Sequence, residues 1–534
     1  MTAMRNQQTR SAFSASTVRA VIKELQAPSK QEAREKWLKA VASRVIIERP
    51  DLAEGLQSIL DVSYDPEHNP LYGLTIGEVG VCYEALTAMS DNDTRKASGQ
   101  FFTPDDAAHF MAQQSMAFPQ GTWMDPCCGV GNLAWHLSAV QNDPASFVRD
   151  RLVLIDIEET ALISAVALIG AGYLASHDIA GLRALRSRAV CRDFLDRTHL
   201  PEHDFTIVNP PYARSSPKTS LKTQATRELF AYFLELIATT SQGFISVTPA
   251  SYLSASKFSV LRDVLDASCT GGHVFVLDNV PDTLFRGYKF GSSNTSHTNF
   301  VRAAITVCAP TFNSWEITPI LRWRAANRAH MFTMAPRLLS SRRIGPAGEW
   351  VKLAPGLDHM WTMLTSAPVT LQDLTVAEPT PYSLTVGTTP RYYISAAFRD
   401  LKRGSKTTLY FNNRHDRDKA AIVLNSSVPY LWWRALDGGI TLPRRVLMST
   451  PIPDFANDKA AYRLVHELQD TEKESMTTKF NAGMLTENVK RPSHLVERLN
   501  TAIMGYTPDL HLLYTEDMAA NTNHEEQYTT PIQE

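Results

Sequence analysis

The segment Asn209-Pro210-Pro211-Tyr212 carries the most specific chemical signal in the sequence. It follows the β-rich run DFTIV, and consecutive prolines continue neither a helix nor a sheet ladder, so the backbone there is stiff and extended. Such a backbone aims the asparagine side-chain oxygen and a proline carbonyl at one point. Two acceptors on the hydrogens of a ring-conjugated amine favour a pyramidal nitrogen with a localised lone pair. We therefore predict that these four residues form an amine-activating site, with the tyrosine as a stacking face. A plain Asn-Pro turn is the alternative.

A glycine-containing turn, DPCCGVG at residues 125–131, follows another predicted strand and opens a helix. Glycine lets backbone N–H groups approach a ligand closely because it has no Cβ. A carboxylate ahead of the glycines would repel a phosphate, but it suits a ligand with an ammonium group. The candidate ligand-binding residues in this turn are Asp125, Pro126, Gly129 and Gly131. A tight turn without a ligand is the alternative.

Acidic residues also follow the next two predicted strands. Asp156 in LVLIDIEE can accept hydrogen bonds from both hydroxyls of a ribose. Asp193 in AVCRDFLD can accept a hydrogen bond from the exocyclic amine of an adenine, with Phe194 against the adenine ring. An exposed strand-end acid is the alternative for Asp156, and a salt bridge with Arg192 is the alternative for Asp193.

From residue 121 onward, short β-rich runs alternate with helical stretches. The runs are TWMDPCC, RLVLIDI, SRAVCRDF, HDFTIVNPPY, GFISVTPASYL, HVFVLDNV and NFVRAAITVC. This alternation predicts an α/β fold with a parallel sheet that helices cover on both faces. Ligands bind at the carboxyl ends of such strands, where the polar motifs fall. Ahead of this region, apolar residues at helical spacing in 17–60 and 74–90 predict a helical module.

The charge of the chain is balanced, with 53 Lys and Arg against 55 Asp and Glu in 534 residues. This average excludes a uniformly basic nucleic-acid binder, but it hides an excess of seven basic residues in 337–450 and of seven acidic residues in 451–534. The sequence has no apolar run of membrane-spanning length, no signal-peptide pattern and no paired CxxC spacing. We therefore expect a cytoplasmic protein that contacts no membrane and needs no metal, and six cysteines cannot form a disulfide scaffold.

In their order along the chain, GQFFTP, DPCCGVG, IDIEE, RDF, NPPY and GFISVTPASYL resemble the gamma class of adenine-N6 DNA methyltransferases. Type I modification subunits and single-chain restriction-linked enzymes belong to this class, and the resemblance covers residues 75–310. It implies a Rossmann-like core that depends on S-adenosylmethionine. Asn132-Leu133 departs from the usual small-residue and Phe step of the class, and plain packing is the simple interpretation of that pair.

The resemblance also implies roles for individual residues. Phe102, Thr103 and Pro104 would border the cofactor site, although a hydrophobic staple and helix cap would explain these residues equally well. Asp125, Gly129 and Gly131 would hold the methionine end of the cofactor, Asp156 its ribose and Asp193 its adenine. The transfer site would consist of Asn209, Pro210 and Tyr212, with Phe285 in DTLFRG as a second stacking aromatic.

The basic segment is the predicted DNA-contacting region, because a site-specific enzyme needs phosphate anchoring and base readout. Its candidate contacts include Arg391, Lys402, Arg403, Lys406 and Arg414. RDLKRGSKTT resembles a basic hairpin loop, and Asn412 and Asn413 are of a type that reads adenine edges. A solvated charged face is the alternative. LNSSVPYLWWRALDGG resembles segments of target-recognition domains, and we expect its two tryptophans to be core residues.

Four segments are predicted: a helical module (1–95), a methyltransferase domain (96–335), a target-recognition region of mixed α/β structure (336–455), and a helical segment with an acidic tail (456–534). The predicted reaction transfers a methyl group from S-adenosylmethionine to N6 of a flipped adenine in duplex DNA, in a restriction-modification or phage-defence setting. Separate restriction or specificity subunits are candidate partners. The alternatives are a protein-glutamine N5-methyltransferase, because NPPY also serves that family, and a modification subunit active only within a complex.

Overall fold

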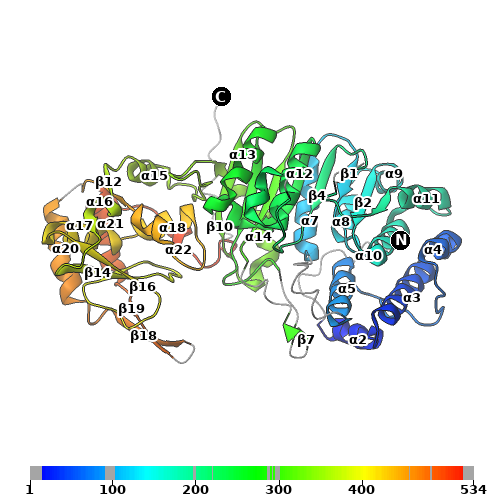
Figure 1. Cartoon of the computed structure of the whole chain (residues 1–534), viewed down its shortest axis with the longest axis horizontal. Coiled ribbons are helices and arrows are strands. Elements are labelled where there is room, and N and C mark those ends of the chain that lie inside the picture. The colour runs from blue at the N-terminus through cyan, green and yellow to red at the C-terminus, as the bar shows by residue number, and fades with distance from the viewer. Residues whose placement is uncertain are drawn as a thin grey trace.

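The computed structural model describes residues 15–90, 103–196, 200–218, 220–285, 289–290, 293–294, 301–455, 458–481 and 484–520. These residues form two lobes along the long axis of the molecule (Figure 1). The N-terminal lobe is built around a nine-stranded sheet, and the C-terminal lobe contains short strands and helices. In the described ranges, none of the helices has the length and apolar character needed to cross a bilayer.

The N-terminal segment is helical, as its apolar spacing predicts. Its helices are α2 (Ala15–Leu25), α3 (Lys30–Glu48), α4 (Ala53–Leu60) and α5 (Ile76–Ser90), with a 3-10 turn at Pro50–Leu52. Helix α3 begins after Ser29, whose side chain accepts a hydrogen bond from the backbone N–H of Glu32 at 3.2 Å. Such a cap satisfies one of the N–H groups that lack a partner in the first helical turn.

These helices pack on the sheet domain through α10 (Glu159–Tyr173). The indole N–H of Trp37 in α3 donates to Ser164 Oγ in α10 at 3.0 Å. The guanidinium of Arg49 donates to the carbonyl oxygens of Ala171 and Leu174 at 2.6 and 3.1 Å. One hydrophobic cluster contains side chains of both α3 and α10. The helical segment and the sheet domain therefore share a core.

The central sheet has the strand order β11-β10-β6-β9-β5-β4-β1-β2-β3. Its strands are β1 (Trp123–Asp125), β2 (Leu152–Asp156), β3 (Ala189–Cys191), β4 (Phe205–Val208), β5 (Gly243–Pro249), β6 (Gly272–Leu277), β9 (Ala303–Cys308), β10 (Trp315–Leu321) and β11 (Ser340–Ser341). The seven β-rich runs of the sequence each contribute one strand, which confirms the predicted α/β sheet. Strands β10 and β11 lie beyond the last run predicted.

The sheet is mostly parallel. Strand β9 runs antiparallel to both of its neighbours, β5 and β6, and β11 runs antiparallel to β10. Helices cover both faces: α7 (Asp105–Gln113), α8 (Asn132–Ala139), α9 (Pro144–Asp150), α10 and α11 (Ile179–Ser187) on one, and α12 (Leu229–Thr240) and α13 (Ser259–Ser268) on the other. Along β2, Leu152 and Leu154 join the first cluster, and Val153 and Ile155 join the second, as alternation along a strand requires.

The C-terminal lobe contains a four-stranded sheet of order β13-β16-β14-β15. These strands are β13 (Thr375–Val376), β14 (Tyr382–Gly387), β15 (Ala396–Ala397) and β16 (Lys406–Phe411). Two further strand pairs are β12 (Val369–Thr370) with β17 (Pro451–Ile452), and β18 (Met476–Asn481) with β19 (Met484–Val489). The helices are α15 (Asp358–Thr365), α16 (Leu371–Leu374), α17 (Arg414–Leu424), α18 (Val428–Leu436), α19 (Arg444–Met448), α20 (Asp458–Asp470), α21 (Ser493–Met504) and α22 (His511–Tyr514).

A single hydrophobic cluster fills this lobe and extends from Val351 to Leu513, across the boundary predicted at residue 455. Trp432 and Trp433 in α18 are 2% and 1% exposed, which confirms that both are core residues. The segment after 455 contributes α20 and α21 to the cluster, but it also contains the β18–β19 hairpin. Its predicted description as helical is therefore wrong for residues 476–489.

The six cysteines do not form a disulfide scaffold, as the sequence predicts. One disulfide joins Cys269, after α13, to Cys308 in β9, and the other four are free thiols. Burial raises the pKa of the Cys127 and Cys128 thiols well above their usual value. Neither side chain is therefore a thiolate nucleophile at neutral pH.

A buried carboxylate, Asp278, holds the two lobes together. It follows β6 and is 2% exposed. Arg302, Arg322 and Arg434 approach its oxygens at 2.8, 3.3 and 3.0 Å. Arg434 belongs to α18 of the C-terminal lobe, whereas the other two flank β9 and β10. Burial alone would raise the pKa of Asp278, but the three guanidinium groups outweigh burial and lower it.

We predict that Asp278→Ala destabilises the protein by ~3–5 kcal/mol, because it leaves buried guanidinium groups without a counter-charge. Urea unfolding at pH 7 measures the effect. Since folding lowers the pKa of Asp278, its contribution to stability is present at neutral pH and is lost as acid protonates the folded carboxylate. The control is Arg498→Ala, which breaks an exposed ion pair with Glu467 in the C-terminal lobe. This variant should change stability little. Equal unfolding midpoints for the two variants would contradict the role of Asp278.

Candidate active site

The order of the strands places the candidate site at the carboxyl ends of β1 and β4. These two strands are neighbours, and the chain continues from β1 toward β2 and β3 in one direction and from β4 toward β5 in the other. A crevice for ligands forms where the strand order reverses in this way. Asp125 is the last residue of β1, and Asn209 directly follows β4. The structure therefore brings the two principal predicted motifs to one edge of the sheet.

The turn after β1 needs both of its glycines. Gly129 and Gly131 have φ angles of +52° and +93°, which side chains rarely tolerate. A Cβ on Gly131 would lie 2.8 Å from Ile169 Cδ1, whereas a Cβ on Gly129 would meet open space. The N–H of Gly129 donates to Asp156 Oδ2 at 2.7 Å. This hydrogen bond holds the turn against the end of β2. The position that a Cβ on Gly129 would take lies in open space.

Two buried carboxyl groups border this turn. Asp125 is 1% exposed, and its hydrogen bond from the backbone N–H of Cys127 is long, at 3.4 Å. Burial, aided by the charge of Asp156, raises the pKa of Asp125 to about 8. Burial also raises the pKa of Asp156, although its side chain accepts hydrogen bonds from Gly129 and Glu158. A cation beside Asp125 would relieve the cost of ionising it.

Polar contacts with neighbouring segments hold the Asn209 motif. Asn209 Nδ2 donates to Thr103 Oγ1 at 3.0 Å, and the Cys127 thiol donates to the Asn209 carbonyl at 3.1 Å. The Tyr212 hydroxyl donates to the carbonyl oxygen of Val247 in β5 at 2.9 Å. Pro210 is buried, whereas Pro211 is half-buried. The side-chain amide of Asn209 is therefore oriented by Thr103, which lies 106 residues earlier in the sequence.

Aromatic rings meet beside this motif. The ring of Tyr212 lies 5.9 Å from that of Phe285, at an interplanar angle of 73°, and 6.4 Å from that of Phe230. Phe285 follows β6 and is 3% exposed, and Tyr212 is half-buried. The structure thus places the predicted second aromatic next to the first.

A buried polar network that the sequence did not predict supports Thr103. The carbonyl oxygen of Thr103 accepts a hydrogen bond from Asn132 Nδ2 at 2.7 Å, while Asn132 Oδ1 is buried without a hydrogen-bond partner among the described residues. Asp105 accepts hydrogen bonds from Thr75 Oγ1 at 2.5 Å and from the N–H of Gly77, and it contacts His136 Nε2 at 3.0 Å. Asn132 therefore makes a specific hydrogen bond in addition to packing in the core. The sequence signal for this contact is an asparagine at the first position of α8, whose residues are mostly buried.

Other predicted cofactor residues lie at the edges of the site. Asp193 is exposed and accepts a hydrogen bond from the N–H of Leu195 at 2.9 Å. The salt bridge considered for it is wrong, since Arg192 pairs with Asp196 instead. Phe194 is 2% exposed and packs against a core phenylalanine of α12. Pro126 is buried beside Asp125, and Pro104 precedes α7. Phe102 lies outside the described residues.

A search against protein-family models matches residues 75–237 to the family described as N-6 DNA Methylase. The match agrees with the resemblance inferred from the order of the motifs over this segment, and the doubly wound sheet has the predicted Rossmann-like arrangement. We call residues 75–237 the methylase segment. A search of curated proteins finds no match for the chain.

Several solved structures are similar to this chain at low identity. The DrdV–DNA complex has 13% identity and a TM-score of 0.40, and the match covers 92% of this chain and 57% of that one. The methyltransferase subunit of a type I restriction-modification system from Streptococcus thermophilus has 17% identity and a TM-score of 0.31, with coverages of 46% and 53%. The type IIG restriction endonuclease BpuSI has 12% identity and a TM-score of 0.41, with coverages of 94% and 80%. The chain spans little more than half the length of the first two.

The predicted DNA contacts lie in the C-terminal lobe, apart from the methylase segment. Arg391, Lys402 and Arg414 are exposed. Arg403 is half-buried and donates to Thr389 Oγ1 at 2.6 Å, and Lys406 pairs with Asp400 at 2.7 Å. These last two side chains hold their loop in place, in addition to any role toward DNA.

The hairpin predicted for this region is wrong. Residues 398–405 do not form a hairpin, because they connect β15 to β16 and these strands lie on opposite sides of β14. Asn413 caps α17: its Oδ1 accepts a hydrogen bond from the N–H of Asp416 at 2.9 Å. This cap engages the side-chain oxygen of Asn413 within the helix, and base readout by Asn412 and Asn413 stays a prediction. Asn412, its neighbour, is exposed.

We predict that Thr103→Val slows DNA methylation about fivefold, because it removes the hydroxyl that orients Asn209, and one net hydrogen bond is worth about 1 kcal/mol. Single-turnover transfer of a labelled methyl group measures the rate. Thr103→Ser keeps the hydroxyl and should restore the rate, while both variants should melt at similar temperatures. A wild-type rate for Thr103→Val would contradict the positioning role.

Proposed function

We propose that this protein is a site-specific DNA methyltransferase that transfers a methyl group from S-adenosylmethionine to N6 of a flipped adenine in duplex DNA. One observation carries the proposal. Asn209-Pro210-Pro211-Tyr212 follows β4 at the same sheet edge as the glycine turn after β1, within the methylase segment. A restriction-modification setting, with separate restriction or specificity subunits as partners, is part of the same proposal.

The residues at the end of β1 fit the proposed cofactor. S-adenosylmethionine supplies an electrophilic methyl group on a sulfonium, and it carries an ammonium group at its amino-acid end. Asp125 is a buried carboxyl group with a weak hydrogen bond, and it gains a counter-charge from that ammonium. Gly129 leaves space where a side chain would obstruct the ligand. Asp156 would hold the ribose and Asp193 the adenine, with Thr103, Pro104 and Phe194 near the same pocket.

Asn209 activates the acceptor amine in this proposal. Asn209 Nδ2 donates to Thr103, and in this proposal Asn209 Oδ1 accepts a hydrogen of the target amine. The Pro210 carbonyl accepts the second hydrogen, and the two acceptors together favour the pyramidal geometry of the attacking nitrogen. Tyr212 and Phe285 provide the aromatic surface for the extruded base. The catalytic effect comes from positioning and from hydrogen bonds that strengthen as the amine pyramidalises.

The test of the proposal is transfer of labelled methyl groups to DNA. We expect wild-type protein to label unmethylated plasmid, with the label on N6 of adenine after digestion to nucleosides. Asn209→Ala should lower transfer by at least about a hundredfold, because it removes an interaction that strengthens in the transition state. Cofactor affinity should survive in this variant, as measured by calorimetry. Near-normal transfer by Asn209→Ala would contradict the assigned mechanism.

The same assay separates the alternatives. The glutamine substrate of a protein-glutamine N5-methyltransferase also presents a conjugated NH2 group to NPPY. Such an enzyme would label a release-factor protein but leave DNA unlabelled. A modification subunit active only within a complex would bind the cofactor but would label DNA only after its partner subunits are added. Size-exclusion chromatography with and without DNA shows whether the isolated chain assembles.

We predict that cofactor binding at pH 7 releases about one proton from Asp125. Its pKa of about 8 keeps the empty site largely protonated, and the bound ammonium favours the ionised carboxylate. Calorimetry in buffers of different ionisation enthalpy measures the released proton. Asp125→Asn should abolish this release and weaken binding at least about thirtyfold, the cost of removing one partner of a buried charge pair. The prediction fails if the proton release persists in Asp125→Asn.

A further inference from the structure

The β18–β19 hairpin projects from the C-terminal lobe, and the predicted function does not use it (Figure 1). Its six cross-strand pairs run from Met476 with Val489 at the root to Asn481 with Met484 at the far end. At the root, Val489 and Met476 pack against Ala397 and Leu401 in a small cluster. The hairpin is therefore anchored at one end only.

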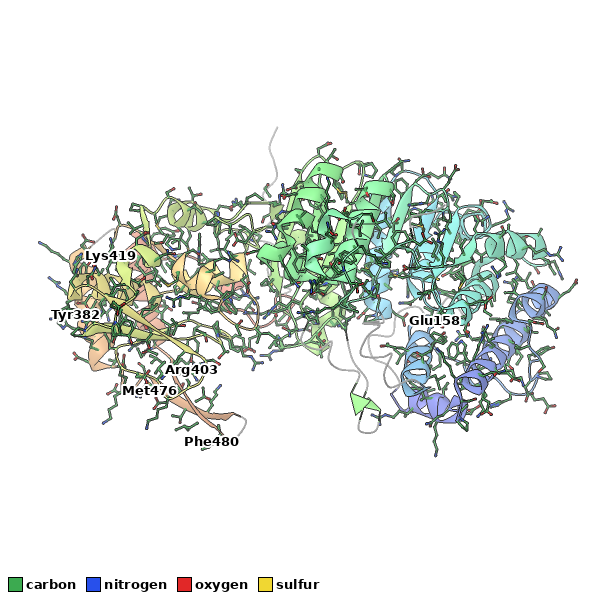
Figure 2. All side chains as sticks on the ribbon, viewed as in Figure 1. Glu158, Tyr382, Arg403, Lys419, Met476 and Phe480 are labelled. Carbon is green, nitrogen blue, oxygen red and sulfur yellow. A yellow bond between two sulfur atoms is a disulfide. The ribbon has the colours of Figure 1, made fainter. Side chains whose placement is uncertain are left out.

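The far end of the hairpin exposes apolar side chains. Phe480 is 79% exposed and pairs with Leu485, which is 42% exposed. Because side chains alternate along strands, both lie on the face that carries Met476 and Val489. Figure 2 shows Phe480 at the end of the hairpin, away from Met476 and Arg403. Neither of these side chains belongs to the hydrophobic clusters of the lobe.

Basic residues lie along the hairpin, most of them nearer its root than its tip. The adjoining loop, residues 398–406, carries four basic residues and one acidic residue. It is tied to the hairpin, since Arg399 pairs with Glu487 at 3.2 Å and the N–H of Lys402 donates to the same carboxylate at 2.7 Å. The charge of Glu487 is thereby compensated. Lys402 and Lys479 are exposed, one at the loop and one next to Phe480.

The hairpin lies on the same side of the molecule as an extension of the candidate active site. Strand β7 (Lys289–Phe290) begins four residues after Phe285, whose ring contacts Tyr212. In Figure 1, β7 and the β18–β19 hairpin both project downward from the long axis of the molecule. A long ligand along that side can contact both lobes.

We propose that the β18–β19 hairpin is a DNA wedge in which Phe480, supported by Leu485, inserts between stacked base pairs while Lys402 and Lys479 contact flanking phosphates. The inference rests on the DNA substrate of the proposed function and adds a contact outside the methylase segment. Apolar side chains that enter a base step unstack it and bend the duplex. Exposed cations beside them add phosphate contacts. Among the described side chains of the hairpin, the exposed apolar surface consists of Phe480 and Leu485, which is too small for a stable protein interface and favours DNA as the occupant.

The test is relaxation of a closed plasmid by a topoisomerase in the presence of bound protein, because insertion into a base step unwinds DNA and changes the final linking number. This readout needs neither the recognition sequence nor methyl transfer. We expect wild-type protein to shift the topoisomers and Phe480→Ala to lose this shift. Phe480→Ala should also bind the plasmid about tenfold more weakly, because it loses the contacts with one base step. Phe480→Trp keeps a large aromatic and should retain the shift. The matched control is Met116→Ala, an equally exposed apolar residue in the N-terminal lobe at 81%, which should behave as wild type.

An unchanged topoisomer shift in Phe480→Ala overturns the wedge. The wedge is also overturned if wild-type protein methylates the plasmid but does not shift its topoisomers. In both cases the proposed methyltransferase function would stand. If wild-type protein shifts the topoisomers and Phe480→Ala does not, but no methyl transfer occurs, the wedge stands and the proposed function fails. The two inferences are therefore decided by different measurements.

Discussion

The lateral pairing of β1 with β4 fixes where the chemistry of this chain can occur. Trp123 pairs with Phe205 and Met124 with Thr206, so Asp125 and Asn209 leave the sheet at one edge although more than eighty residues separate them. The glycine turn then follows from steric need, because the chain must reverse between that edge and α8. Thr103 approaches the same edge from a segment ahead of the sheet. The fold thus assembles the site from three separate parts of the chain around one strand pair.

Two buried aspartates show how the same side chain serves different purposes. Asp125 and Asp278 are almost equally buried, at 1% and 2% exposure. The pKa of Asp125 is raised because burial and a second carboxylate oppose its charge, whereas the pKa of Asp278 is lowered because three guanidinium groups outweigh burial. Asp278 is therefore satisfied within the protein and stabilises it. Asp125 gains a counter-charge only when a cationic ligand arrives, which is typical of a binding residue.

The strands of the sheet and the residues around Asn209 were predictable from the sequence, because short apolar runs followed by polar motifs specify strand ends locally. The contact between Asn209 and Thr103 was not, since it depends on how α7 packs against the sheet. The loop at 398–405 has a turn-like composition, but composition does not show that β14 lies between the strands it connects. The β18–β19 hairpin left only a weak signal, the turn-forming residues Asn481-Ala482-Gly483, because the flanking segments MTTKF and LTENV do not alternate between apolar and polar residues.

The arginine cluster around Asp278 also restricts how such a protein can change during evolution. Recombination could exchange the C-terminal lobe while the candidate active site stays as it is. However, the incoming lobe would have to carry a cation where Arg434 now stands and a hydroxyl where Tyr430 meets Arg322 at 2.6 Å. A graft without them would bury unbalanced charge at the seam. Compatibility between lobes is thus set by a few polar side chains at their junction, so a lobe can be exchanged only among chains that share this junction.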